Sequence, residues 1–272
     1  MIRASLTLAV FSLAMTLSAS PISANDEPKP PSPKERYIAL SAARNHDGLV
    51  ALWKELPDKV IPVIDSDLEQ SLGIWENHGE KKRAEIDALI TRAIAGAHAA
   101  VEATGRRRVL DYVTSFAGWT AVEKKEFRSG QGAFGEASKA LKASKYDTAL
   151  EQGRRCRALA EPLGDWWGTA MGLQAEGMAL AGLGRQAEAV TALSRARLIY
   201  RELGLTSSAL RIEASLAALL IELDRQPRAE AMIRDGLATA RRLKIESLIG
   251  EFTSLTEKLG AQKSNAPARP RR

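Results

Sequence analysis

Few side chains in this sequence are suited to nucleophilic, acid–base or metal chemistry. The 272 residues include a single cysteine, Cys156, which excludes an intramolecular disulfide and a cysteine-based zinc site. The histidines are His46, His78 and His98. A thiol beside a histidine is a candidate nucleophile. However, Cys156 aligns with Ala196 and Gly236 of the repeats described below, so we expect a buried, small, apolar residue there.

Two charged segments have a functional and a structural interpretation. Asp65, Asp67 and Glu69 have part of the acidic spacing of a calcium-binding loop, but Gln70 stands where that loop needs glycine. Apolar residues at three- and four-residue spacing run through the segment, which predicts a helix and no calcium site. Arg106–Arg108 could contact an anion, but we expect a solvated turn. The sequence also has no phosphate-binding loop, dinucleotide fingerprint or nucleophile elbow. We therefore predict no metal, no cofactor and no enzymatic activity of its own.

The N-terminus has the pattern of an export signal. A basic residue, Arg3, precedes the apolar run 6–17, which is too short to span a membrane. We expect cleavage between Ala24 and Asn25, with retention as an anchor as the alternative. Residues 25–32 form a proline-rich spacer. The mature chain is then expected to be periplasmic or secreted.

The positive charge of the chain is concentrated in its C-terminal tail. The formal net charge is +6, and residues 261–272 alone carry Lys263, Arg269, Arg271 and Arg272. A nucleic-acid-binding surface needs basic residues clustered on a folded face, so we expect no nucleic-acid partner. The tail is expected to be disordered, and weak contact with an anionic envelope through it is one alternative function.

Three segments repeat with a period of 40 residues: 144–165, 184–205 and 224–245. Small residues coincide at Ala149, Ala189 and Ala229, and each segment follows another stretch of helical periodicity. Each unit therefore reads as two helices and two turns, and such units must stack to bury their apolar faces. We predict an all-α helix-turn-helix repeat solenoid over residues 130–260, closed by a capping helix at 246–259. Residues 33–129 are expected to be helical but less regular, with Arg92–Gly105 resembling the second helix of a repeat.

The repeats resemble the tetratricopeptide repeat family. The best match is carried by Gly177, Leu180, Gly184, Ala189, Leu193 and Ala196. The 40-residue period departs from the family's 34, and the usual aromatic residues are aliphatic here. The resemblance implies a concave groove lined by the first helix of each unit, which binds a protein or peptide. The groove residues that it implies are Phe134, Lys142, Trp167, Met171, Gln174, Met178 and Arg211.

These expectations favour a non-enzymatic exported scaffold that binds a partner through the groove. The neighbours Trp166 and Trp167 point about 100° apart on a helix, so one of them is expected to line the groove. The groove is mixed and methionine-containing, so an apolar or amphipathic helix or peptide is the expected ligand. Besides the envelope-associating adaptor, a further alternative is the regulatory helical arm of a separately encoded hydrolase.

Overall fold

The computed structural model describes residues 30–265, and every helix that it contains belongs to one compact unit, Ser32–Arg272. The described residues form helices and turns without a β-strand, which confirms the predicted all-α fold. The expected export segment, most of the spacer and residues 266–272 of the tail lie outside the described residues. Residues 261–265 of the tail, which were expected to be disordered, belong instead to the last helix, which ends at Asn265.

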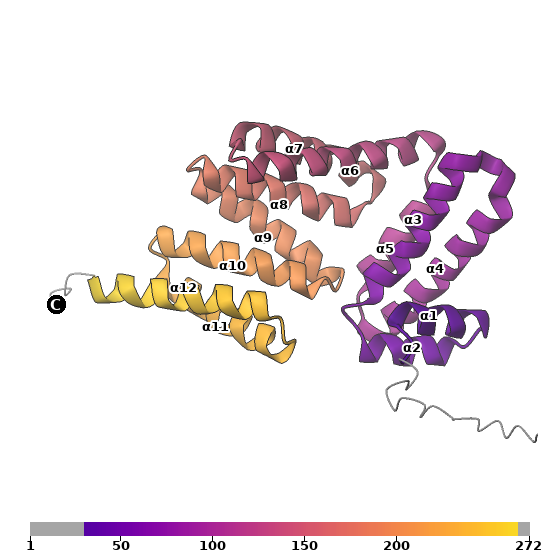
Figure 1. Cartoon of the computed structure of the whole chain (residues 1–272), viewed down its shortest axis with the longest axis horizontal. Coiled ribbons are helices and arrows are strands. Elements are labelled where there is room, and N and C mark those ends of the chain that lie inside the picture. Colours follow the sequence, from indigo (N-terminus) through magenta and orange to yellow (C-terminus); the bar gives the residue numbers. More distant parts are fainter. Residues whose placement is uncertain (1–29, 266–272) are drawn as a thin grey trace, which may run out of the picture. The chain divides into compact units, whose positions relative to one another are not determined.

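The C-terminal part is a helical repeat solenoid, as predicted. Figure 1 shows its helices stacked in chain order, and each helix packs against the next one. The first unit also brings α6 against α8, and the last brings α10 against α12. The elements are α6 (Ala121–Lys142), α7 (Tyr146–Leu163), α8 (Trp166–Gly182), α9 (Gln186–Glu202), α10 (Thr206–Glu222), α11 (Gln226–Arg242) and α12 (Glu246–Asn265).

One turn geometry recurs every 20 residues and sets the repeat. The backbone has positive φ at Ser144, Gly164, Gly184, Gly204, Asp224 and Lys244. After each of these, the next amide donates to a carbonyl five residues earlier, as in Lys145 to Ala140 and Arg185 to Leu180. This left-handed C-terminal motif satisfies the free carbonyls at a helix end and reverses the chain. Two such turns make the 40-residue period.

Small residues let helices of the solenoid approach at backbone distance. A Cβ added to Gly172 of α8 would lie 2.7 Å from the Arg157 amide nitrogen and 2.9 Å from the Gly153 carbonyl oxygen of α7. Cys156 is buried at the same helix pair, with Sγ 3.5 Å from the Gly168 carbonyl oxygen. Its predicted role as a buried small residue is confirmed.

The N-terminal half is also helical, and α4 packs against most of the other helices there. Its first helix begins with a capping box between Ser32 and Glu35, and Pro33 stands in its first turn. The second helix is capped by the Asn45 side chain, which accepts a hydrogen bond of 2.9 Å from the Gly48 amide. The elements are α1 (Pro33–Ala42), α2 (His46–Glu55), α3 (Val60–His78), the 3-10 turn η1 (Gly79–Lys82), α4 (Arg83–Thr104) and α5 (Arg107–Gly118).

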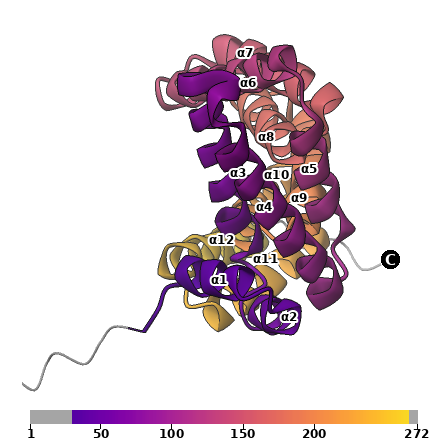
Figure 2. The same ribbon diagram turned by 90° about the vertical axis from the view of Figure 1, so that its right-hand side faces the viewer.

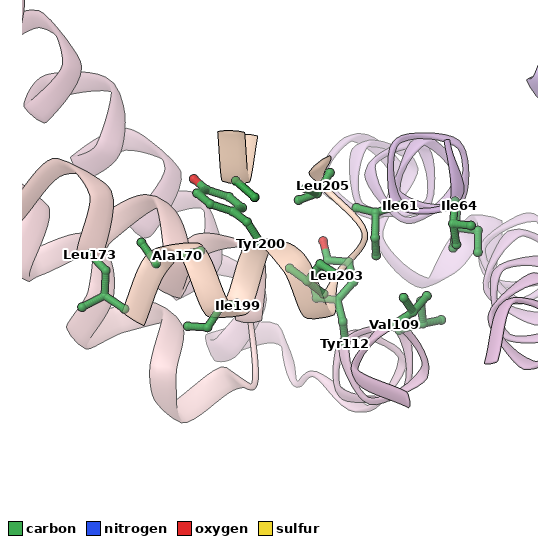
Figure 3. Close-up of a cluster of buried hydrophobic side chains, with 14 of the residues drawn as sticks. Ile61, Ile64, Val109, Tyr112, Ala170, Leu173, Ile199, Tyr200, Leu203 and Leu205 are labelled. Carbon is green, nitrogen blue, oxygen red and sulfur yellow. The ribbon is translucent and has the colours of Figure 1, made fainter. Parts of the chain in front are cut away.

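The N-terminal half and the repeats as far as α10 share one hydrophobic core, and α10, α11 and α12 enclose a second, separate one. Ile61 of α3 and Tyr112 of α5 lie beside Leu203 and Leu205 of the α9–α10 turn, as Figure 3 shows. The turned view in Figure 2 places α3 and α5 alongside the repeats. Residue 130, the expected start of the repeat region, lies inside α6, which begins nine residues earlier with a capping box at Thr120. The N-terminal half is thus built onto the first repeats and forms a wall beside them.

Candidate functional site

A cavity of about 160 Å³ lies where the N-terminal half meets the first repeats. Helices α3 and α5 supply one wall, and α6, α7 and the start of α8 supply the others. Its lining combines acidic, aromatic and sulfur-containing side chains. The residues are Asp65, Glu69, Tyr112, Glu126, Phe127, Gly130, Gln131, Phe134, Cys156, Ala160, Asp165, Trp167, Gly168 and Met171.

Two carboxyl groups of the cavity are held by neutral donors. The Tyr112 hydroxyl donates to Asp65 Oδ1 at 2.5 Å, and the Gly168 amide donates to Asp165 Oδ1 at 2.8 Å. Asp165 is the N-cap of α8 and is only 5% exposed. Burial raises the pKa of Asp65 to about 6 and that of Asp165 to about 7, because it disfavours the charged form.

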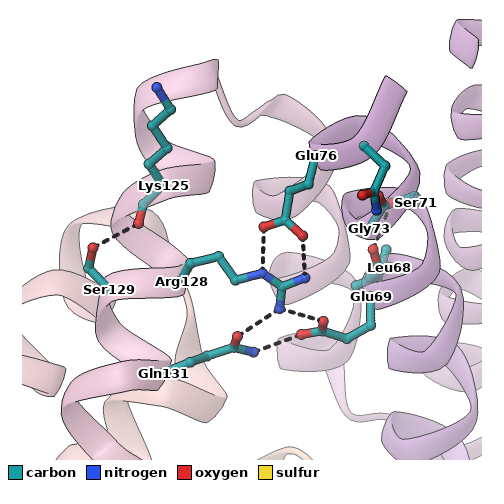
Figure 4. Close-up of polar contacts among 10 residues, drawn as sticks. Leu68, Glu69, Ser71, Gly73, Glu76, Lys125, Arg128, Ser129 and Gln131 are labelled. Atoms are coloured by element: carbon teal, nitrogen blue, oxygen red, sulfur yellow. Dashed lines mark hydrogen bonds and ion pairs between the residues drawn. The ribbon is translucent and has the colours of Figure 1, made fainter. Parts of the chain in front are cut away.

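The mouth of the cavity carries a polar network that joins α3 to α6 (Figure 4). The Arg128 guanidinium donates to Glu76 at 2.8 Å and 3.1 Å and to Glu69 at 2.7 Å. The Gln131 amide also donates to Glu69, at 2.7 Å. The exposed residues Glu126 and Gln131 lie at the solvent side, whereas Tyr112 and Asp165 are buried. The cavity therefore has a polar rim and a buried floor.

The structure brings three of the seven expected groove residues together. Phe134 of α6 and Trp167 and Met171 of α8 line the cavity, because helical spacing places them on facing sides of two packed helices. The other four lie elsewhere: Lys142, Gln174, Met178 and Arg211 do not contribute to its walls.

The remaining four differ in their surroundings. Gln174 is half-buried and accepts a hydrogen bond of 2.8 Å from the Tyr200 hydroxyl of α9. Lys142, Met178 and Arg211 are exposed.

The tryptophan pair divides between two sites. Both rings are half-buried, but Trp167 lines the cavity and Trp166 lies under the Arg108 guanidinium, whose carbon is 4.0 Å from the ring centroid. Arg108 also pairs with Glu202, and Arg106 donates to the Pro57 carbonyl at 3.4 Å. Of these three arginines only Arg107 is exposed. Arg108 joins α5 to α8 and α9, and Arg106 joins it to the turn between α2 and α3, so the expected solvated turn was wrong for these two residues.

The acidic segment 65–69 lies within α3, as predicted, and its side chains have structural partners. Asp67 is fully buried and accepts hydrogen bonds from Arg92 and Tyr37. No group of three or more His, Cys, Asp or Glu side chains within residues 30–265 is placed to hold a metal ion. Burial also raises the pKa of the Cys156 thiol to about 12, which opposes formation of a thiolate nucleophile.

Sequence reasoning missed the α3 and α5 contribution to the site. Asp65, Glu69 and Tyr112 lie more than 40 residues before the cavity residues of α7 and α8. Their own periodicity shows only that they lie on helices.

Comparison with protein-family models and with curated protein sequences finds no match to this chain. Among the described residues, no helix is both long enough and apolar enough to span a bilayer. The functional argument therefore rests on the repeat fold and on the cavity.

Proposed function

We propose that this protein is a non-enzymatic adaptor of the tetratricopeptide-repeat type, exported from the cell, that binds a peptide segment of another protein along the inner faces of α6 and α8. The observation that carries the proposal is the convergence of Phe134, Trp167 and Met171 on one cavity. Repeat helices that expose aromatic and methionine side chains in a recess provide adaptable contact area for a peptide.

The size of the recess limits what enters it. A cavity of about 160 Å³ admits one side chain and not a folded segment, so the bulk of a partner must lie outside it. Exposed Lys142 of α6 and Met178 of α8 lie C-terminal to the cavity residues on the same two helices, which offers a continuation for the rest of a peptide. This arrangement corresponds to the anchor-in-pocket mode of peptide recognition.

The test is selection of peptides from a random displayed library on the mature chain, followed by affinity measurement. A Phe134→Ala/Met171→Ala variant removes cavity contacts, and Leu198→Ala removes a side chain that is 57% exposed on α9 and outside the cavity. We expect enriched peptides whose affinity falls at least tenfold in the double variant and is unchanged in the control. Equal affinity for all three proteins would contradict the proposal. Circular dichroism and melting curves establish that the variants fold.

A further inference from the structure

We propose that the cavity between α3, α5, α6, α7 and α8 binds an organic cation, and that its occupant is one lysine or arginine side chain of the bound peptide. This inference rests on the proposed function and assigns the chemistry of the anchoring residue. It follows from an imbalance of charge in the walls of the cavity.

Buried carboxylates elsewhere in this protein have arginine partners. Asp67 pairs with Arg92 at 2.6 Å and Glu176 with Arg157 at 2.5 Å. Glu213, 4% exposed, pairs with Arg201 in the same way. Buried charges in proteins are normally paired like this, because removal from water disfavours an isolated ion.

The cavity carboxylates break this pattern. Within residues 30–265, Asp165 forms no ion pair, and its partners are backbone amides of its own helix start. Asp65 accepts from the Tyr112 hydroxyl and likewise has no ion pair in the described part of the chain. The charge of Arg128 lowers the pKa of Asp65, but the guanidinium forms its hydrogen bonds with Glu69, Glu76 and Gln131. Two of the carboxyl groups that line the cavity, Asp65 and Asp165, thus have no ion-pair partner among residues 30–265, whereas Glu69 is paired with Arg128.

The rest of the lining selects an organic cation with an apolar stem. Aromatic rings from α5, α6 and α8 line the same space: Tyr112, Phe127, Phe134 and Trp167. A cation near an aromatic face is attracted by about 0.5–2 kcal/mol, with the larger values in desolvated sites. Met171 and Ala160 complete an apolar surface on which methylene groups can pack.

The volume of the cavity limits the length of the basic side chain that can enter it. A cavity of about 150 Å³ in another protein holds benzene, which has about six non-hydrogen atoms. The butylammonium of lysine and the propylguanidinium of arginine are of this size. Since the acidic side chains of the cavity do not form a cluster able to hold a metal, an organic ion suits them better.

Binding of small probes tests the cation chemistry directly. We would titrate the full mature chain at pH 8 with n-butylammonium and propylguanidinium, and with n-pentanol as a neutral probe of similar size. The readouts are calorimetry and saturation-transfer NMR. We expect both cations to bind at least tenfold more tightly than pentanol. Equal binding of the neutral probe, or no binding of either cation, would overturn the inference.

Matched variants tie the binding to the two carboxylates. Asp65→Asn/Asp165→Asn keeps the hydrogen-bond acceptors, including the cap of α8, and removes the charges. Asp147→Asn is the control, because Asp147 is exposed on α7 and does not line the cavity. We expect at least tenfold weaker cation binding in the double variant and an unchanged constant in the control. Circular dichroism and melting curves check folding, and equal binding by a folded double variant would overturn the inference.

Peptides distinguish a bound side chain from a free small cation. Each peptide selected on the chain is remade with norleucine in place of each lysine or arginine in turn. We expect one basic position at which affinity falls at least tenfold, and at which propylguanidinium competes. Peptides that bind well and tolerate every such change would leave the adaptor function standing and refute the basic anchor. Cation binding without any peptide binding would refute both the anchor and the adaptor function.

Discussion

The carboxylate of Asp165 accepts a hydrogen bond from the amide of Gly168 and faces the cavity with the same side chain. A helix N-cap is normally near solvent, where the charged form is well hydrated. Here the cap is only 5% exposed, so one residue both starts α8 and places a titratable carboxyl group in the cavity floor. This double role makes the cavity sensitive to pH.

The stability of the protein is expected to fall as pH rises from about 4 to about 7. The pKa values of Asp65 and Asp165 are raised by burial to about 6 and about 7, from 3.8 when unfolded, so the folded state holds more protons in this window. Each group then contributes a slope of up to about 1.4 kcal/mol per pH unit, with stability higher at the acid end. The titratable groups that interact with Asp165 include Glu69, Tyr112 and Cys156. Urea denaturation at several pH values measures the slope.

Asp165→Asn is the matched variant for this prediction. It preserves the cap and removes the titrating group, so the slope between pH 4 and 7 becomes shallower, by up to about 1.4 kcal/mol per pH unit. Asp147→Asn, at an exposed site, leaves the slope unchanged. Superimposable pH profiles for the native protein and Asp165→Asn would show that Asp165 does not titrate in this range.

The close approach of α7 and α8 makes Gly172 intolerant of a side chain. A Cβ there would meet backbone atoms of Arg157 and Gly153 at 2.7 Å and 2.9 Å, and backbone cannot move aside cheaply. We expect Gly172→Ala to lower the free energy of unfolding by about 1–3 kcal/mol or more. Gly135→Ala in α6 has open space around the new Cβ and should raise it by up to about 1 kcal/mol, because alanine favours helix. Destabilisation of equal size at both positions would contradict the packing described.

The turns at residues 184 and 224 can be compared by exchanging their glycine and aspartate. Both residues have positive φ at the same place in the repeat, but one is Gly184 and the other is Asp224. Asp224→Gly should stabilise the protein by about 0.5–1 kcal/mol, since it removes left-handed strain and an acidic group at a helix C-terminus. Gly184→Asp should destabilise it by a similar amount. Thermal unfolding of both variants measures the two effects, and shifts of the same sign would exclude a shared turn geometry.

Arg128 is expected to join the two halves of the protein at the mouth of the cavity. Arg128→Met leaves Glu69 and Glu76 without their partner, and we expect a loss of about 1 kcal/mol that shrinks in high salt because the groups are partly exposed. Lys139→Met breaks an exposed pair with Glu136 within α6 and should cost less than about 0.5 kcal/mol. Urea denaturation at low and high salt compares them. Equal losses would mean that the α3–α6 network adds nothing beyond a surface pair.

The sequence predicted the solenoid because its signal is local and repeated. Small residues and turn residues recur at a fixed spacing, and each recurrence supports the others, as at Gly164, Gly184 and Gly204. The burial of Cys156 followed from its alignment with Ala196 and Gly236.

The cavity was only partly predictable for a related reason. Phe134, Trp167 and Met171 were expected from the resemblance to tetratricopeptide repeats, which implies a groove lined by the first helix of each unit. Asp65 and Tyr112 reach the cavity through packing of the N-terminal half against the repeats, and nothing in their local pattern encodes that contact. The seven expected groove residues all came from the first helices of the repeat units. The wall of the cavity that α3 and α5 form was therefore not predicted.

Site-specific photo-crosslinking tests the central claim most directly, that a protein partner occupies the recess between the two halves. A p-benzoylphenylalanine group would replace Glu126, which is exposed at the rim of the cavity, or Leu198, which is exposed on α9. The chain would be produced in its natural host and irradiated in intact cells. We predict a discrete protein adduct from position 126 that is lost with Phe134→Ala/Met171→Ala, and none from position 198. An adduct from position 198 alone, or none from position 126, would contradict the claim.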